Sequence, residues 1–541
     1  MRIGRGAAAG LAVLSLVASA AAPPPARAQA PAQAADRQAL IAGLEAQYEV
    51  SLIRERKMAD DRETQMIAAL EARLRAARAQ ADAAKGSAQQ ANAALAQARA
   101  DYARLAGQIA DRDPGVQADV ANYHQQTERE AAAASPEKLA ALQRFADGDR
   151  VAAWGQLKAM FAAEEPTASA ARRAADLREL AGLGDIMRAH GEATTAEVLD
   201  LYDRAVALDP TVFSAEMARL FLAHDLGDLT RARAAGQQAL AVARNDNERA
   251  EALKAIGDQA SDQADFKAAQ DDFDQSFAMF ERVNAANPTP YLENFAAGVL
   301  EDEGELEVRI SDFDAARKNY NSALEIRRRL AAADPANGRM QNALTQVLQR
   351  IGDLDLKLGD LAAAKAAYEE GLAIRQKLLA GDPTNTDLQY DVSGFLRRLG
   401  DVALQARDLA AARQSYEDVI VIRQRLLAAN PSSGQLKDAV ALDFFDLGEV
   451  AFAQNQVDAA RAAYEKCFAM REDLAAVDPT NADLQQLILR VMVRLASTDD
   501  ARIGWPDVAR QYRKIKDAGH LVPADERVLM ALQKRGLAAG L

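Results

Sequence analysis

Two stretches of this sequence, IGDLDLKLGDLAAAKAAYEEGLAIRQKLLAGDP at 351–383 and LGDVALQARDLAAARQSYEDVIVIRQRLLAANP at 399–431, are versions of one pattern, offset by 48 residues. Four residue types recur in this register: Gly304, Gly352, Gly400 and Gly448; Ala316, Ala364, Ala412 and Ala460; Tyr320, Tyr368, Tyr416 and Tyr464; Pro335, Pro383, Pro431 and Pro479. One unit earlier, at a spacing of 47, Gly257, Phe273 and Pro288 take the same roles. Such a register over five units indicates an array of helical repeats and not a globular enzyme domain.

The recurring residue types predict how each repeat packs. A helical hairpin that turns at Gly359 and Asp360 sets Gly352 opposite Tyr368, so the missing side chain leaves room for the ring. A glycine inside a helix costs about 1 kcal/mol relative to alanine, and the close contact must return more than that. The proline that closes each unit ends the second helix and directs the chain into the next one.

The array resembles the tetratricopeptide repeat (TPR) family, whose unit carries Leu-Gly in its first helix, Ala and an aromatic residue in its second, and Pro at the exit. Leu399-Gly400, Ala412, Tyr416 and Pro431 fill those positions. Each helix is seven residues longer than in the 34-residue unit, which is close to two turns and keeps the buried face in place. The repeats are similar to long bacterial repeats and, more loosely, to those of kinesin light chain.

This resemblance implies an all-α fold, with a right-handed TPR-like solenoid over residues 196–503. Repeat arrays need caps because each unit leaves an apolar side uncovered. Two helices within residues 504–541, with Trp505 in the seal, are expected to cap the array.

Composition narrows the class of protein. The chain has 541 residues, of which 49% are apolar and 5% aromatic, and this balance favours packed helices. The net charge of −14 argues against nucleic acid and against an anionic membrane surface as partners, since both require basic patches.

Residues 1–30 are expected to be a secretory signal peptide. Arg2 and Arg5 precede an apolar run at 7–22, and cleavage is expected after Ala28 or Ala30. The alternative is an uncleaved anchor, which a short run closed by three prolines disfavours. We therefore expect export to the periplasm of a Gram-negative bacterium, with no membrane span in the mature chain.

Residues 31–111 are predicted to be a linker and a long coiled-coil helix. Apolar residues alternate in steps of three and four at Ile67, Leu70, Leu74, Ala77, Ala81, Ala84, Ala88, Ala91, Leu95, Ala98, Tyr102, Leu105 and Ile109. This seam over 67–109 fits a homo-oligomer, which we favour, or a long helix that folds back on its own chain near Asp60 and Asp61. Residues 112–195 are predicted to be a helical connector with Trp154 in its core.

An acid follows the first-helix glycine of each repeat: Asp258, Glu305, Asp353, Asp401 and Glu449. The resemblance implies that this position lines a concave groove beside Gln349, Lys357, Arg397, Gln405 and Phe445. Such a carboxylate row would suit a cationic peptide; the alternative is that each acid pairs locally or only solvates the face.

A second recurring charge is an arginine near the end of each second helix: Arg327, Arg375, Arg423 and Arg471. We expect its stem to pack and its head to find a carboxylate.

The sequence contains no pattern of residues typical of a catalytic, cofactor or metal site, so we predict no catalytic residue, no cofactor and no metal site. His124, His190, His224 and His520 lack paired metal-ligand spacing. Cys467 is the single cysteine and is expected in the core, because it takes the register position of Gly371 and Val419.

The preferred hypothesis is a non-catalytic, exported scaffold or adaptor of the bacterial cell envelope. Its coiled coil would set the oligomer, and its TPR groove would bind a protein or peptide of the envelope. The alternatives are a structural spacer without groove activity and an enzyme with an unrecognised site in 116–195.

Overall fold

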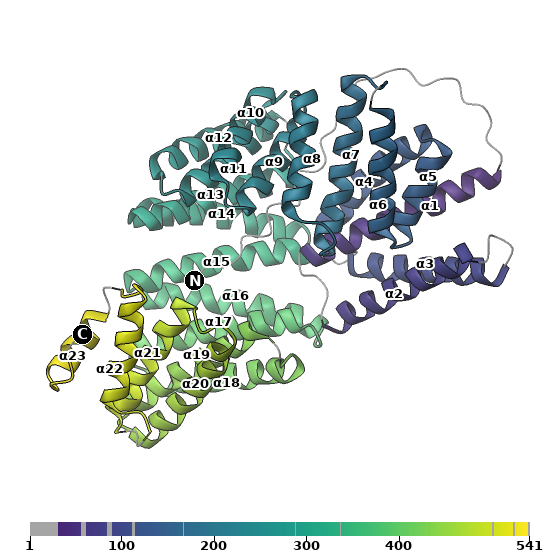
Figure 1. Ribbon diagram of the computed structural model, residues 1–541. Coiled ribbons are helices and arrows are strands. Elements are labelled where there is room, and N and C mark those ends of the chain that lie inside the picture. The colour runs from purple at the N-terminus through teal and green to yellow at the C-terminus, as the bar shows by residue number, and fades with distance from the viewer. Residues whose placement is uncertain are drawn as a thin grey trace. The chain divides into compact units, whose positions relative to one another are not determined.

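The computed structural model describes residues 31–55, 61–83, 89–110, 114–165, 167–286, 288–335, 337–431, 433–499, 502–522 and 525–538 (Figure 1). The expected signal peptide lies outside these residues. Within them the chain is all-α, with helices α1 to α23 and no β-strand. The chain divides into two compact units, residues 1–344 and 345–541, and each is described by itself.

The first unit begins with helices that precede the regular repeats. Their bounds are α1 (Pro31–Glu55), α2 (Asp61–Ala83), α3 (Gln89–Ala110), α4 (Pro114–Ala133), α5 (Pro136–Ala146), α6 (Arg150–Glu164), α7 (Ala170–Ala189), α8 (Thr195–Leu208), α9 (Phe213–Asp225) and α10 (Leu229–Val242). Two repeat pairs follow: α11 (Asp246–Asp262) with α12 (Phe266–Ala286), and α13 (Pro290–Ile310) with α14 (Phe313–Ala333). Helix α15 (Gly338–Leu358) contains the boundary between the units.

The prediction of one long helix over the heptad seam is wrong. Helices α2 and α3 pack side by side, and Arg73 Nη1 lies 3.1 Å from Asp101 Oδ2. In one straight helix these residues would be about 42 Å apart. Most of the described heptad residues, including Ile67, Leu95 and Tyr102, pack with residues of α1 in one cluster. The chain therefore folds back on itself, and residues of α1 cover much of the described seam.

A buried polar network ties this N-terminal hairpin to the next helices. Glu71 of α2 accepts hydrogen bonds from Arg54 (3.0 Å) and Tyr102 (3.2 Å), and its carboxylate lies 3.2 Å from His190 Nδ1. The fully buried Arg150 of α6 lies 3.6 Å from the same carboxylate. Four helices and the residue after α7 thus meet at one carboxylate.

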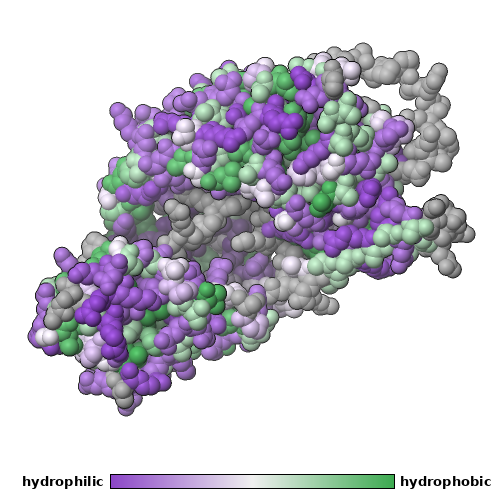
Figure 2. Space-filling view, viewed as in Figure 1, coloured by the Kyte–Doolittle hydropathy of each residue, from purple (hydrophilic) through white to green (hydrophobic). Residues whose placement is uncertain are grey.

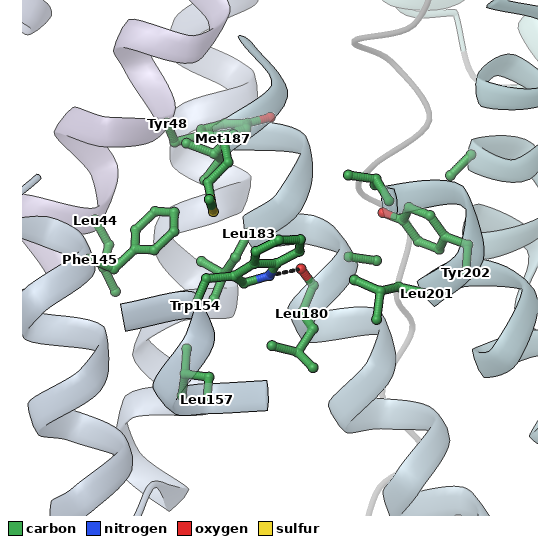
Figure 3. Packing of buried hydrophobic residues seen from close by; sticks show 14 of the residues in the cluster. Leu44, Tyr48, Phe145, Trp154, Leu157, Leu180, Leu183, Met187, Leu201 and Tyr202 are labelled. Atoms are coloured by element: carbon green, nitrogen blue, oxygen red, sulfur yellow. Dashed lines mark hydrogen bonds between the residues drawn. The ribbon is translucent and has the colours of Figure 1, made fainter. Parts of the chain in front are cut away.

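Trp154 lies in the core of the first unit, as its apolar neighbours in the sequence predict. Its indole N–H donates a hydrogen bond of 2.9 Å to the carbonyl oxygen of Leu180, and Phe145 and Leu157 belong to the same cluster (Figure 3). Val151, three residues before Trp154 on α6, is exposed.

The second unit consists of long helical pairs. Their bounds are α16 (Leu361–Gly381), α17 (Thr386–Gln405), α18 (Leu409–Ala429), α19 (Gly434–Ala453), α20 (Val457–Val477), α21 (Ala482–Ser497), α22 (Trp505–Asp517) and α23 (Glu526–Gln533). We call the first helix of a pair helix A and the second helix B. Helix A has 20 residues in α17 and α19, and helix B has 21 in α16, α18 and α20. Each helix packs on its sequence neighbours, as in a solenoid.

Each helix A glycine lies against the aromatic ring of its own repeat. A Cβ atom on Gly400 would lie 2.8 Å from Tyr416 Cε1, and one on Gly448 would lie 2.5 Å from Tyr464 Cε1. The same ring contact occurs at Gly257, Gly304 and Gly352. These distances are too short for any side chain, so glycine lets the two helices approach closely at this level.

The turn inside each pair has one geometry throughout the array. The residue directly before the helix B cap is left-handed, with positive φ at Ala264, Ser311, Gly359, Arg407 and Asn455. In most repeats an aspartate follows and caps helix B; Asp360, for example, accepts a hydrogen bond of 3.1 Å from the Ala363 N–H. At the exit, helix B ends before the Asp-Pro or Asn-Pro pair.

The last helices close the apolar end of the second unit. Val508 and Tyr512 of α22 are buried against α21, and Trp505 packs beside them with the Arg535 guanidinium 3.7 Å from its ring. Among the described helices none is long and apolar enough to span a membrane. Figure 2 shows hydrophilic residues over much of the visible surface, with hydrophobic residues in separate small groups.

Candidate functional site

The candidate site is the row of acids that follow the helix A glycines. In the second unit each of these acids accepts a hydrogen bond from the tyrosine hydroxyl of its own repeat: Tyr368 to Asp353 (2.6 Å), Tyr416 to Asp401 (2.7 Å) and Tyr464 to Glu449 (2.5 Å). The ring rests on the glycine, so its hydroxyl reaches the next residue of helix A. The contact that packs the repeat thus also positions the carboxylate.

The same acids also have cationic partners. Arg398 Nε lies 3.0 Å from Asp353 Oδ1, Arg397 Nη1 lies 3.4 Å from Asp401 Oδ2, and Arg494 pairs with Glu449. Two of these arginines, Arg398 and Arg494, come from the following helix A. The acids therefore pair locally, which is the alternative to a free carboxylate row. They still reach solvent, since the Asp353 side chain is 48% exposed.

Burial raises the pKa of each of these three tyrosines far above its usual range, and the neighbouring carboxylate adds to the effect. The hydroxyl groups therefore stay protonated and act as hydrogen-bond donors. A protonated phenol beside a carboxylate is an orienting group here and has no proton to transfer near neutral pH.

Two further acids of α19 extend the row, and the sequence interpretation missed both. Asp443 is fully buried, with Arg423 Nη1 at 2.8 Å, and Asp446 lies 2.7 Å from Arg397 Nη2. Burial raises the pKa of Asp443 to about 7 and that of Asp446 to about 6, although the arginines oppose the shift. Asp443 could have been recognised from the sequence, because it stands at a repeat position that is apolar in the earlier repeats: Val299, Val347 and Phe395.

In the first unit, the corresponding acid positions are half-buried. Asp258 lies 3.0 Å from Lys254 Nζ, which also lies 2.6 Å from Asp302. Glu305 follows Gly304 in the same way on α13.

The remaining predicted groove residues differ in accessibility. Lys357 and Gln405 are exposed near the ends of their helices, whereas Gln349 and Arg397 are half-buried. Phe445 is buried, and its ring centroid lies 5.6 Å from that of Tyr464. Phe445 thus packs inside its own repeat and cannot contact a partner, in contrast to our expectation for a groove residue.

The recurring helix B arginines are buried. Arg327 Nε lies 2.8 Å from Glu301, Arg375 Nη1 lies 3.2 Å from Asp391, and Arg423 binds Asp443. Arg471 Nε lies 3.6 Å from Asp438. The partner comes sometimes from the same repeat and sometimes from the next, so no fixed spacing predicts it.

The helical connector contains an open cleft of about 530 Å³ between α6, α7 and α8. Its lining includes Lys158, Phe161, Arg173 and Asp176. Burial raises the pKa of Asp176, although Arg172 opposes the shift. In the part of the chain that the structure describes, no group of three or more His, Cys, Asp or Glu residues is placed to hold a metal ion. Cys467 is buried, and burial raises the pKa of its thiol to about 12.

Several solved structures are similar to parts of this chain. BtubC (BKLC) from P. vanneervenii is 18% identical, with a TM-score of 0.35 over 43% of this chain and 89% of that one. The Signal Transduction ATPase with Numerous Domains (STAND) protein with a tetratricopeptide repeat sensor from Pyrococcus horikoshii is 13% identical, with a TM-score of 0.47 over 76% of this chain and 57% of that one. PilF of Pseudomonas aeruginosa is 16% identical, with a TM-score of 0.30 over 47% of this chain and 91% of that one.

No curated protein matches the sequence. A family model described as tetratricopeptide repeat matches residues 345–378. This range contains Gly352, Ala364 and Tyr368, which meet between α15 and α16 and recur at the same register in the other pairs. Residues 345–378 are therefore a tetratricopeptide repeat, and the other long pairs of the chain repeat its register.

Proposed function

We propose that this chain is an exported, non-catalytic scaffold of the bacterial cell envelope that holds a protein partner along its helix A faces. Tetratricopeptide repeats generally mediate protein–protein interactions, and stacked pairs offer a long surface with one geometry at each step. The observation that carries the proposal is the row of Asp353, Asp401 and Glu449, each held by a tyrosine hydroxyl and still partly exposed.

The row supports a basic partner segment. Each acid pairs with an arginine across a partly exposed surface, where an ion pair contributes about 1 kcal/mol or less. A lysine or arginine of a partner can therefore exchange with Arg398 or Arg494 at low cost. The repeat spacing would place successive basic residues of the partner at successive carboxylates.

Photo-crosslinking in the producing bacterium tests this surface. A photoreactive residue at Lys357 or Gln405, which are exposed on helix A, should yield a discrete crosslinked protein. The same residue at Glu369, which is exposed on helix B, is the matched control and should yield none. Equal products from both helices, or none from helix A, would contradict the proposal.

Export is tested separately, because it rests on residues 1–30 alone. Fractionation of the producing cell should recover a shortened chain from the periplasm. A deletion of residues 7–22 should leave the full-length chain in the cytoplasm, whereas periplasmic recovery of that deletion variant would contradict a signal peptide.

A further inference from the structure

Glu303 of α13 breaks the pattern of the repeats. It directly precedes the helix A glycine, a position that is apolar in the other four units: Ile256, Ile351, Leu399 and Leu447. The side chain is nonetheless buried, with 4% of its surface exposed. Burial of a carboxylate costs free energy unless the group is paired. This unit therefore carries a charge where every other unit carries an aliphatic side chain.

The contacts of Glu303 leave it without a counter-charge. Its Oε2 accepts a hydrogen bond of 3.1 Å from the Asn319 amide of α14, which also lies 3.1 Å from both carboxylate oxygens of Glu307. Glu303 Oε1 is buried and has no hydrogen-bond partner. Within the described residues, no lysine or arginine forms an ion pair with Glu303 or Glu307; Lys318 of α14 acts on them only from a greater distance.

The surroundings of the pair are acidic. Burial, and then the charges of Asp274 on α12 and of Glu307 and Asp302 on α13, raise the pKa of Glu303 to about 8. Burial and the charges of Asp312 and Asp274 raise the pKa of Glu307 to about 7, against the hydrogen bond from Asn319. Among the described residues, the charge of Lys318 opposes these shifts, but it is too weak to hold the two carboxyl groups ionised.

Two other buried acids of the chain, which have structural roles, each form an ion pair with an arginine. Asp443 also takes an apolar register position, but Arg423 binds it at 2.8 Å. Glu301, two residues before Glu303 on α13, pairs with Arg327 at 2.8 Å. Each of these acids has an arginine of the chain itself. Glu303 and Glu307 have the same burial and lack the cation.

We propose that Glu303 and Glu307 form a receptor for a lysine or arginine side chain of a protein partner, between helices α12 and α14. This rests on the proposed function only in that the occupant belongs to a protein. An ammonium or guanidinium group brings a full charge and several donors, and it can replace the single amide of Asn319, which is itself half-exposed. Asp274, exposed on α12, adds attraction for a cation, because its charge acts on both carboxyl groups.

The receptor has a consequence for stability in the free protein. The pKa of Glu303 is raised from 4.5 when unfolded to about 8 when folded, so its contribution to stability is full below about pH 4.5 and is lost as the pH rises through 8. Replacement by leucine, the residue of two other repeats, should remove this loss. Glu303→Leu should therefore raise the melting temperature at pH 8 and flatten its decline between pH 5 and 8. A lower melting temperature would show that Glu303 supports the fold and would overturn the proposal.

Calorimetric titration of the full chain at pH 7.5 with a lysine-rich dodecapeptide tests binding. The acetyl-lysine version of the peptide is the control ligand. Two buffers with different ionisation enthalpies report the protons released. We expect release of up to about one proton per site, because the cation ionises the raised carboxyl groups. Glu303→Leu and Glu307→Gln should each weaken binding about tenfold or more, and Glu325→Gln, an exposed acid of α14, should not.

Three results would overturn the inference. The first is no binding of the lysine-rich peptide. The second is binding of the peptide by Glu303→Leu with the same affinity as the parent chain and without proton release. That result would assign the peptide to the general acidic surface. The third is loss of binding in the Asp353→Asn, Asp401→Asn, Glu449→Gln triple variant with full binding in Glu303→Leu. That last result would place the site on the helix A row and leave the proposed function intact.

Discussion

At the scale of single residues, the glycine of helix A decides how closely the two helices of a repeat approach. A methyl group on Gly448 would lie 2.5 Å from the ring of Tyr464, and the ring is fully buried and cannot move away. The same ring holds Glu449 through its hydroxyl, so packing and the candidate site share one side chain.

Gly448→Ala should therefore destabilise the second unit by about 1–3 kcal/mol through overpacking. Gly394→Ala is the matched control, because Gly394 also lies inside a helix A but a Cβ there meets only Arg398 Nη1, at 3.7 Å. The control should stabilise by up to about 1 kcal/mol from helix propensity alone. Chemical denaturation measures both, and equal effects of the two substitutions would contradict the ring contact.

The sequence predicts this glycine–ring contact because both residues recur at a fixed spacing across a short turn. It does not predict the partners of the acids, since Arg398 and Arg494 come from the next helix A and Arg397 from the same one. Nor does it show that Phe445 turns inward onto Tyr464. Charged partners follow from the stacking of successive pairs, which the spacing within one repeat does not specify.

At the scale of elements, the turn between helix A and helix B carries backbone strain that varies among repeats. The left-handed residue is glycine only at Gly359, whereas Arg407 has φ 61° with a full side chain. A non-glycine residue in this conformation costs about 1–2 kcal/mol.

Arg407→Gly should accordingly raise the stability of the second unit by about 1 kcal/mol, and Gly359→Ala should lower it by a similar amount. Thermal melting of the two variants beside the parent chain measures the difference. A loss of stability in Arg407→Gly would mean that the arginine side chain contributes more than its backbone strain costs.

The N-terminal hairpin depends on a different element contact, the carboxylate of Glu71. Burial alone would raise its pKa, but the hydrogen bond with His190 and the charges of Arg150 and Arg54 lower it to about 2, from 4.5. A lowered pKa means that the stabilisation is present above about pH 4.5 and is lost as the pH falls towards 2.

Glu71→Gln should therefore lower the melting temperature at pH 7 and have a progressively smaller effect below pH 4. Glu137→Gln, an exposed acid at the start of α5, is the control and should have no effect at either pH. An unchanged melting temperature for Glu71→Gln at pH 7 would contradict a role of this network in holding α2 to α6.

This hairpin also shows what a heptad pattern in the sequence can and cannot predict. The alternation from Ile67 to Ile109 identifies the buried side of α2 and α3, and Leu74, Leu95 and Tyr102 are indeed interior. An apolar seam has the same pattern whether it faces a second chain or another helix of its own chain. The choice depends on α1 and on the polar network around Glu71, whose members come from distant parts of the sequence.

At the scale of the whole molecule, the repeats of the second unit present the same pair of tyrosine and acid at each step. The tyrosine of each repeat of the second unit fixes one acid, so neutral substitution of these acids changes the surface charge and keeps a hydrogen-bond acceptor for the ring. Fold and binding can therefore be separated by experiment. We propose that the helix A carboxylates recognise the partner.

The most direct test compares two charge-matched triple variants. One carries Asp353→Asn, Asp401→Asn and Glu449→Gln on helix A, and the other carries Glu369→Gln, Glu417→Gln and Glu465→Gln at the same spacing on helix B. The affinity of each is measured for the protein that crosslinks at Lys357. We predict a loss of about tenfold or more for the helix A variant and no change for the helix B variant. Equal affinity of the two variants would contradict recognition of the partner by the helix A carboxylates.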